Sequence, residues 1–180
     1  MVMTTSNMLP LGTKATDFKL LDTTSGKEKN LSELKSDKAT VIMFICNHCP
    51  FVKHVQQELT KLAKDYLAKG VAFIAISSND VNNYPDDAPE KMRAMDYPFP
   101  YLYDETQLVA KAYDAACTPD FYIFNKEMKL VYRGQLDDSR PGNSIPVTGS
   151  DIRAALDSML AGRLVNPDQK PSIGCNIKWK

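Results

Sequence analysis

Long hydrophobic runs and an excess of one charge sign are both missing from this 180-residue chain. The longest uninterrupted apolar runs, residues 41–46 and 71–76, are far shorter than the about 20 residues that a membrane-spanning helix needs. The 22 basic and 22 acidic residues cancel, so little charge is available to neutralise a nucleic-acid backbone. We therefore expect neither a membrane nor a nucleic acid as a partner.

Cysteine is also scarce, because four cysteines are too few for a disulfide scaffold at this length. A domain of this size buries roughly 70% of its unfolded surface, so its core needs no covalent staple. Residues 1–7 lack the basic start and the apolar stretch of a secretory signal. We expect a cytoplasmic protein whose cysteines are thiols.

The apolar pattern predicts a strand, a helix and a second strand near the middle of the chain. Residues 39–45 form a continuous run that is rich in β-branched and apolar residues, which is typical of a strand buried on both faces. Apolar residues then recur every three or four positions from Val52 to Tyr66, and Gly70 ends this helical pattern. Residues 71–77 form the second buried strand, which we expect to run parallel to the first.

No repeat or linker divides the sequence, so it predicts one domain over residues 1–180, with a core at about 13–162 and an irregular C-terminal tail at 163–180. The expected fold class is α/β, with a mixed central sheet flanked by helices and an N-terminal hairpin. The other predicted elements are a hairpin at 17–21 and 27–30, a helical turn at 32–34, helices at 90–95, 106–113 and 151–160 (the last capped by Ser150), strands at 99–103, 121–124 and 129–132, and a loop at 136–148.

The most informative motif is the pair Cys46 and Cys49, which stands where the first buried strand gives way to the helix. A C-x-x-C at such a junction predicts a thiol–disulfide site. The unpaired N–H groups and the positive pole of the helix favour a thiolate, so we expect a lowered pKa for Cys46. Cys49 lies one turn further on, close enough to resolve a mixed disulfide, and Pro50 fits the first helical turn.

The two residues between the cysteines, Asn47 and His48, are candidates for tuning the pKa of Cys46. An imidazole can supply a charge or a hydrogen bond to a thiolate, and a stabilised thiolate makes the couple more oxidising. Two other interpretations stay open. The cysteines could be buried packing residues, or they could bind zinc or copper with one or both of His48 and His54. We predict no resident metal or other cofactor, and a solvated His54.

The order of these features resembles the thioredoxin-like redoxins, the group that includes the thioredoxins and the alkyl hydroperoxide reductase/thiol-specific antioxidant family. The resemblance rests on the motif from Cys46 to Pro50 and on Thr118 followed by Pro119, and it covers about residues 10–162. It implies a thioredoxin fold with a cis Thr118–Pro119 bond beside the cysteine pair. The backbone of Thr118 would then be free to pair with an extended substrate segment, which makes Thr118 and Pro119 candidates for substrate positioning.

Two departures from these families bear on the chemistry. Thioredoxins carry a buried acid in the strand before the cysteine pair, whereas residues 39–45 hold only Thr40 and apolar side chains. Peroxiredoxins carry a threonine and a proline upstream of their peroxide-reactive cysteine. Counted back from Cys49, those positions hold Cys46 and Ile42, which weakens a direct reaction with peroxide.

Four further residues are weaker candidates. Cys117 precedes the Thr-Pro pair, and Cys175 lies in a tail long enough to return to the catalytic edge, so either could be an auxiliary thiol instead of a packing residue. Arg140 and Arg133 could support a thiolate or an anionic substrate near Cys46, although charged loops of this kind are usually only solvated.

The sequence thus predicts a thiol–disulfide oxidoreductase in which Cys46 attacks a disulfide and Cys49 resolves the intermediate. One alternative is a thiol peroxidase in which Cys49 is oxidised and Cys46 resolves it. Another is a copper or zinc carrier on the same fold. The expected partners are a disulfide-bearing protein or a small disulfide or peroxide, together with a thiol or reductase that supplies electrons.

Overall fold

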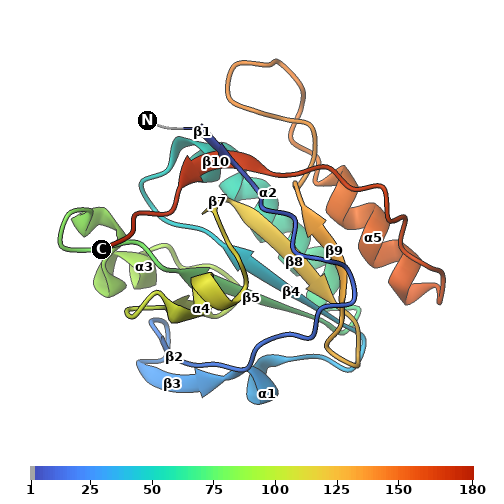
Figure 1. Cartoon of the computed structure of the whole chain (residues 1–180), viewed down its shortest axis with the longest axis horizontal. Helices are drawn as coiled ribbons and strands as arrows, with labels where there is room; N and C mark the ends of the chain where they lie inside the picture. Colours follow the sequence, from blue (N-terminus) through green and yellow to red (C-terminus); the bar gives the residue numbers. More distant parts are fainter. Residues whose placement is uncertain (1–2) are drawn as a thin grey trace.

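The computed structural model describes residues 3–180, and a seven-stranded mixed sheet forms its centre (Figure 1). The strand order is β3-β2-β6-β5-β4-β8-β9. The strands of this sheet are β2 Lys19–Asp22, β3 Lys27–Asn30, β4 Ala39–Phe44, β5 Val71–Ser77, β6 Tyr101–Tyr103, β8 Asp120–Phe124 and β9 Leu130–Gly134. The helices are α1 Leu31–Leu34, α2 Pro50–Leu67, α3 Pro89–Ala94, α4 Leu108–Ala112 and α5 Ser150–Leu160, with a 3-10 turn at Pro85–Asp87.

The unit β4–α2–β5 confirms the predicted strand–helix–strand arrangement. Strands β4 and β5 pair in parallel, with Ala39 opposite Val71 and Phe44 opposite Ile76. Every residue of β4 is buried, because both faces of the sheet are covered. Each predicted helix and strand is present within two residues at either end.

Two apolar cores lie on the two faces of the sheet. One core contains the inward sides of α2 and α5 together with Val41 and Met43 of β4. The other core contains α4 together with Ile42 and Phe44 of β4, whose side chains point to the opposite face. Leu59 and Leu62 of α2 are fully buried in the first core. Burial of each such side chain contributes about 1.5–3 kcal/mol, which holds α2 against the sheet. The first turn of α2, which directly follows the cysteine motif, is thereby held in place.

A second, three-stranded sheet corrects the prediction of an irregular tail. Strand β10 Ile173–Asn176 lies between β1 Met3–Thr5 and β7 Cys117–Thr118 (Figure 1). The three strands have two to four residues each, which is too short for a periodic pattern to reveal them. Their pairing comes from segments far apart in the sequence, so only the folded chain brings them together.

Helix α5 begins differently from the prediction. Gly149, with a φ of 69°, is its N-cap, and Ser150 is its first helical residue and not the cap. The left-handed backbone at this position favours glycine.

Among residues 3–180, no helix combines the length and the apolar character that crossing a bilayer requires.

Candidate active site

The two cysteines of the motif lie at the end of β4 and the start of α2. Cys46 follows β4 by two residues, and Cys49 is the N-cap of α2, with Pro50 as the first helical residue. A proline fits there because the N–H groups of the first turn have no partner within the helix. Cys46 and Cys49 are 1% and 0% exposed, and both are free thiols. The motif therefore holds two enclosed sulfurs at the positive end of a long helix.

Cys49 is the sulfur that this environment ionises more readily. A hydrogen bond from the Cys46 thiol contributes most to lowering the pKa of Cys49, to about 4, against the opposing effect of burial. Cys175 and the backbone N–H of Val52 lower it further. The sulfur atoms of Cys49 and Cys175 lie 2.7 Å apart, and the Thr118 carbonyl oxygen lies 3.4 Å from Cys49 Sγ.

The expectation of a lowered pKa for Cys46 is wrong in this structure. The hydrogen bond to Cys49 raises the pKa of Cys46 most, and burial and the negative charge of Asp87 raise it further. Its sulfur lies 3.9 Å from His48 Nδ1 and 3.6 Å from the Thr118 hydroxyl oxygen. The hydrogen bond between the two sulfurs decides the difference, because it raises the pKa of Cys46 and lowers the pKa of Cys49.

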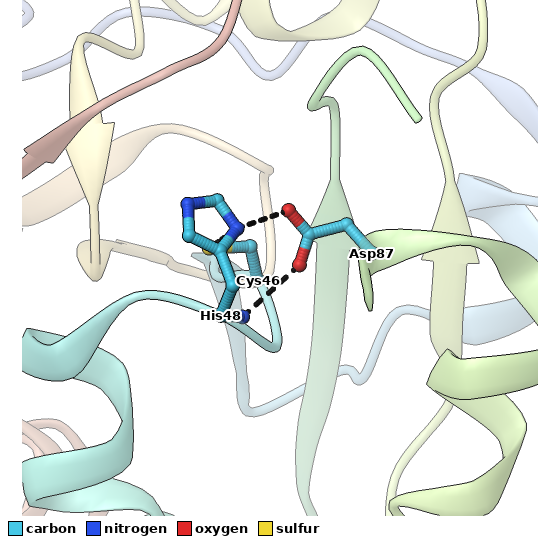
Figure 2. A group of neighbouring side chains, drawn as sticks. All are labelled: Cys46, His48 and Asp87. Atoms are coloured by element: carbon cyan, nitrogen blue, oxygen red, sulfur yellow. Dashed lines mark hydrogen bonds and ion pairs between the residues drawn. The ribbon is translucent and has the colours of Figure 1, made fainter. Parts of the chain in front are cut away.

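Asp87 is a site residue that the sequence analysis missed. Its side chain is fully buried, and one carboxylate oxygen lies 2.5 Å from His48 Nδ1 (Figure 2). The other accepts hydrogen bonds from the backbone N–H groups of Asn47 and His48 at 2.7 and 3.1 Å. Burial alone would raise the pKa of Asp87, but the hydrogen bonds from His48 and Asn79 hold it below its ordinary value. A buried carboxylate therefore faces the cysteine motif.

His48 lies between Cys46 and Asp87, with its side chain 23% exposed and its ring stacked on Tyr84 at 5.1 Å. The same nitrogen, Nδ1, faces both the sulfur and the carboxylate. The side chain of Asn47 bonds other partners than the sulfurs: its amide donates to the Asp86 carbonyl and accepts from the Tyr101 hydroxyl. Asn47 thus anchors the loop, and His48 is the motif residue in a position to act on Cys46.

The Thr118–Pro119 peptide bond is cis, as the resemblance implied. Thr118 contacts the cysteine pair through both its hydroxyl and its carbonyl oxygen. Its backbone is not free for a substrate segment, because Thr118 pairs with Cys175 of β10 in an antiparallel register. The tail of the chain therefore occupies the strand edge that we expected to be open.

The two other cysteines differ in their surroundings. Cys175, 2% exposed, contacts Cys49, and burial and this contact raise its pKa to about 12. Cys117 is also buried, and burial and the nearby Asp120 raise its pKa far above the ordinary value. Its nearest hydrogen-bond partner is the Pro119 carbonyl, 3.7 Å away. The structure brings Cys175 to the pair, whereas Cys117 stays in the neighbouring strand.

The predicted arginine support is wrong. Arg133 binds the carbonyl of Leu9 and the side chain of Gln169. Arg140 binds the carbonyls of its own loop and the side chain of Gln135. Both guanidinium groups thus hold loops together, which leaves neither directed at Cys46. His54 is exposed, as predicted, and bonds Ser139 at 2.8 Å.

Cys46, His48 and Asp87 also offer the one set of potential metal ligands found among residues 3–180. The sulfur, the Nδ1 atom and a carboxylate oxygen lie within 4.8 Å of one another. Thiolate, imidazole and carboxylate are all ligands that zinc accepts. The set differs from the one predicted, because it contains Asp87 and neither Cys49 nor His54.

Comparisons with known proteins concern the family and the fold of the chain. The pattern of the AhpC/TSA family matches residues 11–133. No curated protein matches the chain. A conserved, uncharacterized protein from Geobacillus kaustophilus is 65% identical over 100% of this chain and 97% of its own, with a TM-score of 0.98.

Two more distant structures share the fold alone. The thioredoxin domain of a thiol-disulfide oxidoreductase from Bacteroides vulgatus is 18% identical over 72% of this chain and 91% of its own, with a TM-score of 0.61. A yeast mitochondrial 1-Cys peroxiredoxin is 16% identical over 86% of this chain and 78% of its own, with a TM-score of 0.63. The predicted thioredoxin-like α/β fold is thereby confirmed.

Proposed function

We propose, from the premise that this chain belongs to the AhpC/TSA family, that it is a thiol–disulfide oxidoreductase whose Cys46 and Cys49 cycle between dithiol and disulfide. The family supports a redox function of thiols in general, and the specific reaction is our inference from the site.

One observation carries this proposal: the two sulfurs have opposite pKa shifts and share a hydrogen bond. The pKa of Cys49 falls to about 4, while the Cys46 thiol that donates to it has a raised pKa. At neutral pH the pair then holds one proton and one negative charge. The Cys49 thiolate can therefore accept the proton of Cys46, whose thiolate is then the reactive form in disulfide exchange.

We assign the first attack to Cys46. It borders the partly exposed His48, whereas Cys49 is enclosed by Thr118, Cys175 and the start of α2. Cys46 passes its proton to Cys49 and attacks one sulfur of the substrate, whose disulfide bond breaks. The leaving thiolate takes the proton from Cys49. Cys49 then attacks the Cys46 sulfur, the mixed disulfide breaks, and the second substrate thiolate departs.

This cycle leaves a Cys46–Cys49 disulfide and a reduced substrate. The two electrons have moved from the cysteine pair to the substrate, so an external thiol or reductase must return them. In this scheme the Cys49 thiolate accepts the proton of Cys46. The strand before the motif, residues 39–45, contains no acidic side chain that could take this role.

Redox titration against glutathione tests the proposal. Cys46 and Cys49 share the tryptic peptide 39–53, so their disulfide appears as a loss of two hydrogens from that peptide. We expect a two-electron transition between the dithiol and disulfide forms, and loss of turnover with a chromogenic aromatic disulfide in Cys46→Ser and Cys49→Ser. Cys117→Ser is the matched control and should retain activity. Persistence of the dithiol across the whole titration contradicts the proposal.

The lowered pKa of Cys49 also favours a second candidate, a thiol peroxidase. A thiolate of this kind attacks the O–O bond of a hydroperoxide, forming a sulfenic acid and releasing the alcohol or water. Stopped-flow consumption of hydrogen peroxide separates the two functions. A peroxidase predicts a rapid reaction in Cys46→Ser and none in Cys49→Ser, whereas the disulfide-exchange proposal predicts slow consumption in both.

A further inference from the structure

Strand β10 occupies the edge of the site where an extended substrate segment would bind. It pairs antiparallel with β7, with Cys175 opposite Thr118 and Asn176 opposite Cys117. Thr118 is the residue before the cis proline, and its carbonyl oxygen contacts Cys49 Sγ. A cysteine of the chain itself therefore lies at the position that a substrate cysteine would take in strand addition.

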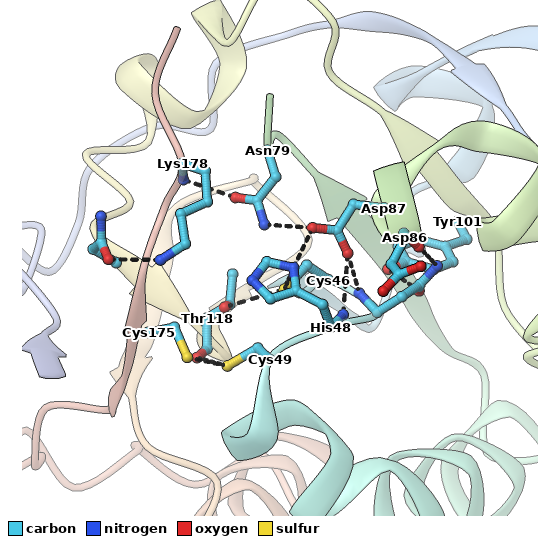
Figure 3. Close-up of polar contacts among 12 residues, drawn as sticks. Cys46, His48, Cys49, Asn79, Asp86, Asp87, Tyr101, Thr118, Cys175 and Lys178 are labelled. Atoms are coloured by element: carbon cyan, nitrogen blue, oxygen red, sulfur yellow. Dashed lines mark hydrogen bonds and ion pairs between the residues drawn. The ribbon is translucent and has the colours of Figure 1, made fainter. Parts of the chain in front are cut away.

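The close approach of β10 depends on Gly174. A Cβ atom at this position would overlap the carbonyl group of Thr118, so no larger residue fits without moving the strand. The result is a buried contact in which Cys175 Sγ lies 2.7 Å from Cys49 Sγ (Figure 3). The sequence places these two cysteines 126 positions apart, so the register of β10 alone creates the contact.

The tail also reaches the opposite side of the site. The backbone N–H of Lys178 donates to the Asn79 side chain at 2.9 Å, and the Asn79 amide donates to Asp87 at 2.9 Å. Asp87 in turn binds His48 beside Cys46 (Figure 3). One short segment therefore contacts Cys49 directly and joins Cys46 through a chain of hydrogen bonds. This arrangement holds the tail in register with both sulfurs.

We propose that β10 is a built-in substrate strand and that Cys175 is a third redox thiol, which exchanges a disulfide with Cys49. The inference rests on the proposed thiol–disulfide function and adds a step to it. Cys175 attacks the Cys49 sulfur of the Cys46–Cys49 disulfide and gives up its proton as it does so. That bond breaks, a Cys49–Cys175 bond forms, and Cys46 takes up the proton that Cys175 released. No electrons leave the protein, so the step needs no further oxidant.

Peptide mapping after oxidation distinguishes the two disulfides. Cys46 and Cys49 lie in tryptic peptide 39–53, and Cys175 lies in peptide 164–178, so a Cys49–Cys175 bond joins two peptides. The reduced chain is treated with one equivalent of diamide, which accepts the two hydrogens of a dithiol. In Cys46→Ser we expect peptides 39–53 and 164–178 to be cross-linked. Free thiols at both Cys49 and Cys175 in this variant, once it is shown to be folded by circular dichroism, would overturn the inference.

Further variants separate this inference from the proposed function. Cys46→Ala repeats the first test if the serine variant fails to fold. Gly174→Ala keeps every thiol but displaces β10. We therefore expect loss of the cross-link between peptides 39–53 and 164–178, while the Cys46–Cys49 disulfide still forms. A cross-link at the same yield as with Gly174 contradicts the docking of β10.

Cys175→Ser should still form the Cys46–Cys49 disulfide, because that reaction needs only the motif. Absence of this disulfide in both the wild type and Cys175→Ser counts against the proposed function, even if Cys46→Ser gives the cross-link. Cys117→Ser is the buried-thiol control, and its pattern should match the wild type.

Discussion

Replacing Asp87 by asparagine should lower the pKa of Cys46, because the buried carboxylate is a negative charge that opposes ionisation of the neighbouring thiol. A carboxylate oxygen of Asp87 lies within 4.8 Å of Cys46 Sγ. At an effective dielectric constant of about 20, two unit charges 4.8 Å apart interact by about 3.5 kcal/mol. This energy corresponds to about 2.5 pKa units. The hydrogen bond from His48 offsets part of the carboxylate charge, so we expect a fall of about 1–2 units.

The assay uses a background in which Cys46 is the sole thiol, with Cys49, Cys117 and Cys175 replaced by serine. This background removes the coupled titration with Cys49, so the measured value belongs to one group. The rate of alkylation by iodoacetamide, followed by mass spectrometry across the pH range, gives the pKa of Cys46 with and without the Asp87→Asn change.

Asp86→Asn is the matched control, since Asp86 is the adjacent carboxylate and is exposed. It contacts the site through its backbone carbonyl, so its side-chain charge should leave the pKa of Cys46 nearly unchanged. An unchanged or higher pKa of Cys46 in Asp87→Asn would refute the view that this carboxylate controls the site.

Three other predictions follow from the same structure. His48→Ala leaves the charge of Asp87 facing Cys46, which destabilises the negative charge of the reduced cysteine pair and hence the dithiol form. The reduction potential measured by glutathione titration should therefore fall by about 30 mV for each 1.4 kcal/mol lost. A higher potential contradicts this role. Burial raises the pKa of Asp120 to about 7, above the value of about 3.9 in the unfolded chain. The folded protein therefore binds a proton at Asp120 more tightly than the unfolded chain does. The stability that this proton contributes is complete below pH 4 and is lost as the pH rises through 7. Asp120→Asn should remove this loss and raise the free energy of unfolding at pH 8 by up to about 4 kcal/mol relative to that at pH 4, in urea titrations at both pH values; an unaltered pH dependence contradicts the shift. Leu59→Ala should lower the free energy of unfolding by about 2–5 kcal/mol in the same titrations, because Leu59 is fully buried between α2 and the sheet, and a loss below 1 kcal/mol would contradict that packing.

Local patterns in the sequence were sufficient to predict the elements that carry the cysteine motif. The apolar run of β4 and the three-and-four spacing of α2 report burial within a single segment, so they place Cys46 and Cys49 at a strand–helix junction without knowledge of the rest of the chain. The cis bond before Pro119 followed from the resemblance and not from any local pattern.

The electrostatics of the site could not be predicted in this way. Asp87 lies in a polar stretch 39 residues beyond His48, and no periodicity marks it as buried. The pKa of a thiol depends on charges and hydrogen-bond donors a few ångströms away in space, whatever their distance along the chain. The hydrogen bond between the two sulfurs, the burial of Cys46 and the charge of Asp87 therefore raise the pKa of Cys46, which the sequence had predicted to be lowered.

The sequence by itself determined which residues could do redox chemistry and which strand and helix present them, because burial and helix initiation are written in short-range patterns. The tertiary structure alone decided which of these residues meet. Strand β10 has four residues and no amphipathic signal, yet its pairing with β7 puts Cys175 against Cys49. Pairing between distant strands depends on backbone hydrogen bonds that any residue offers, so the side-chain sequence of either strand carries little trace of it.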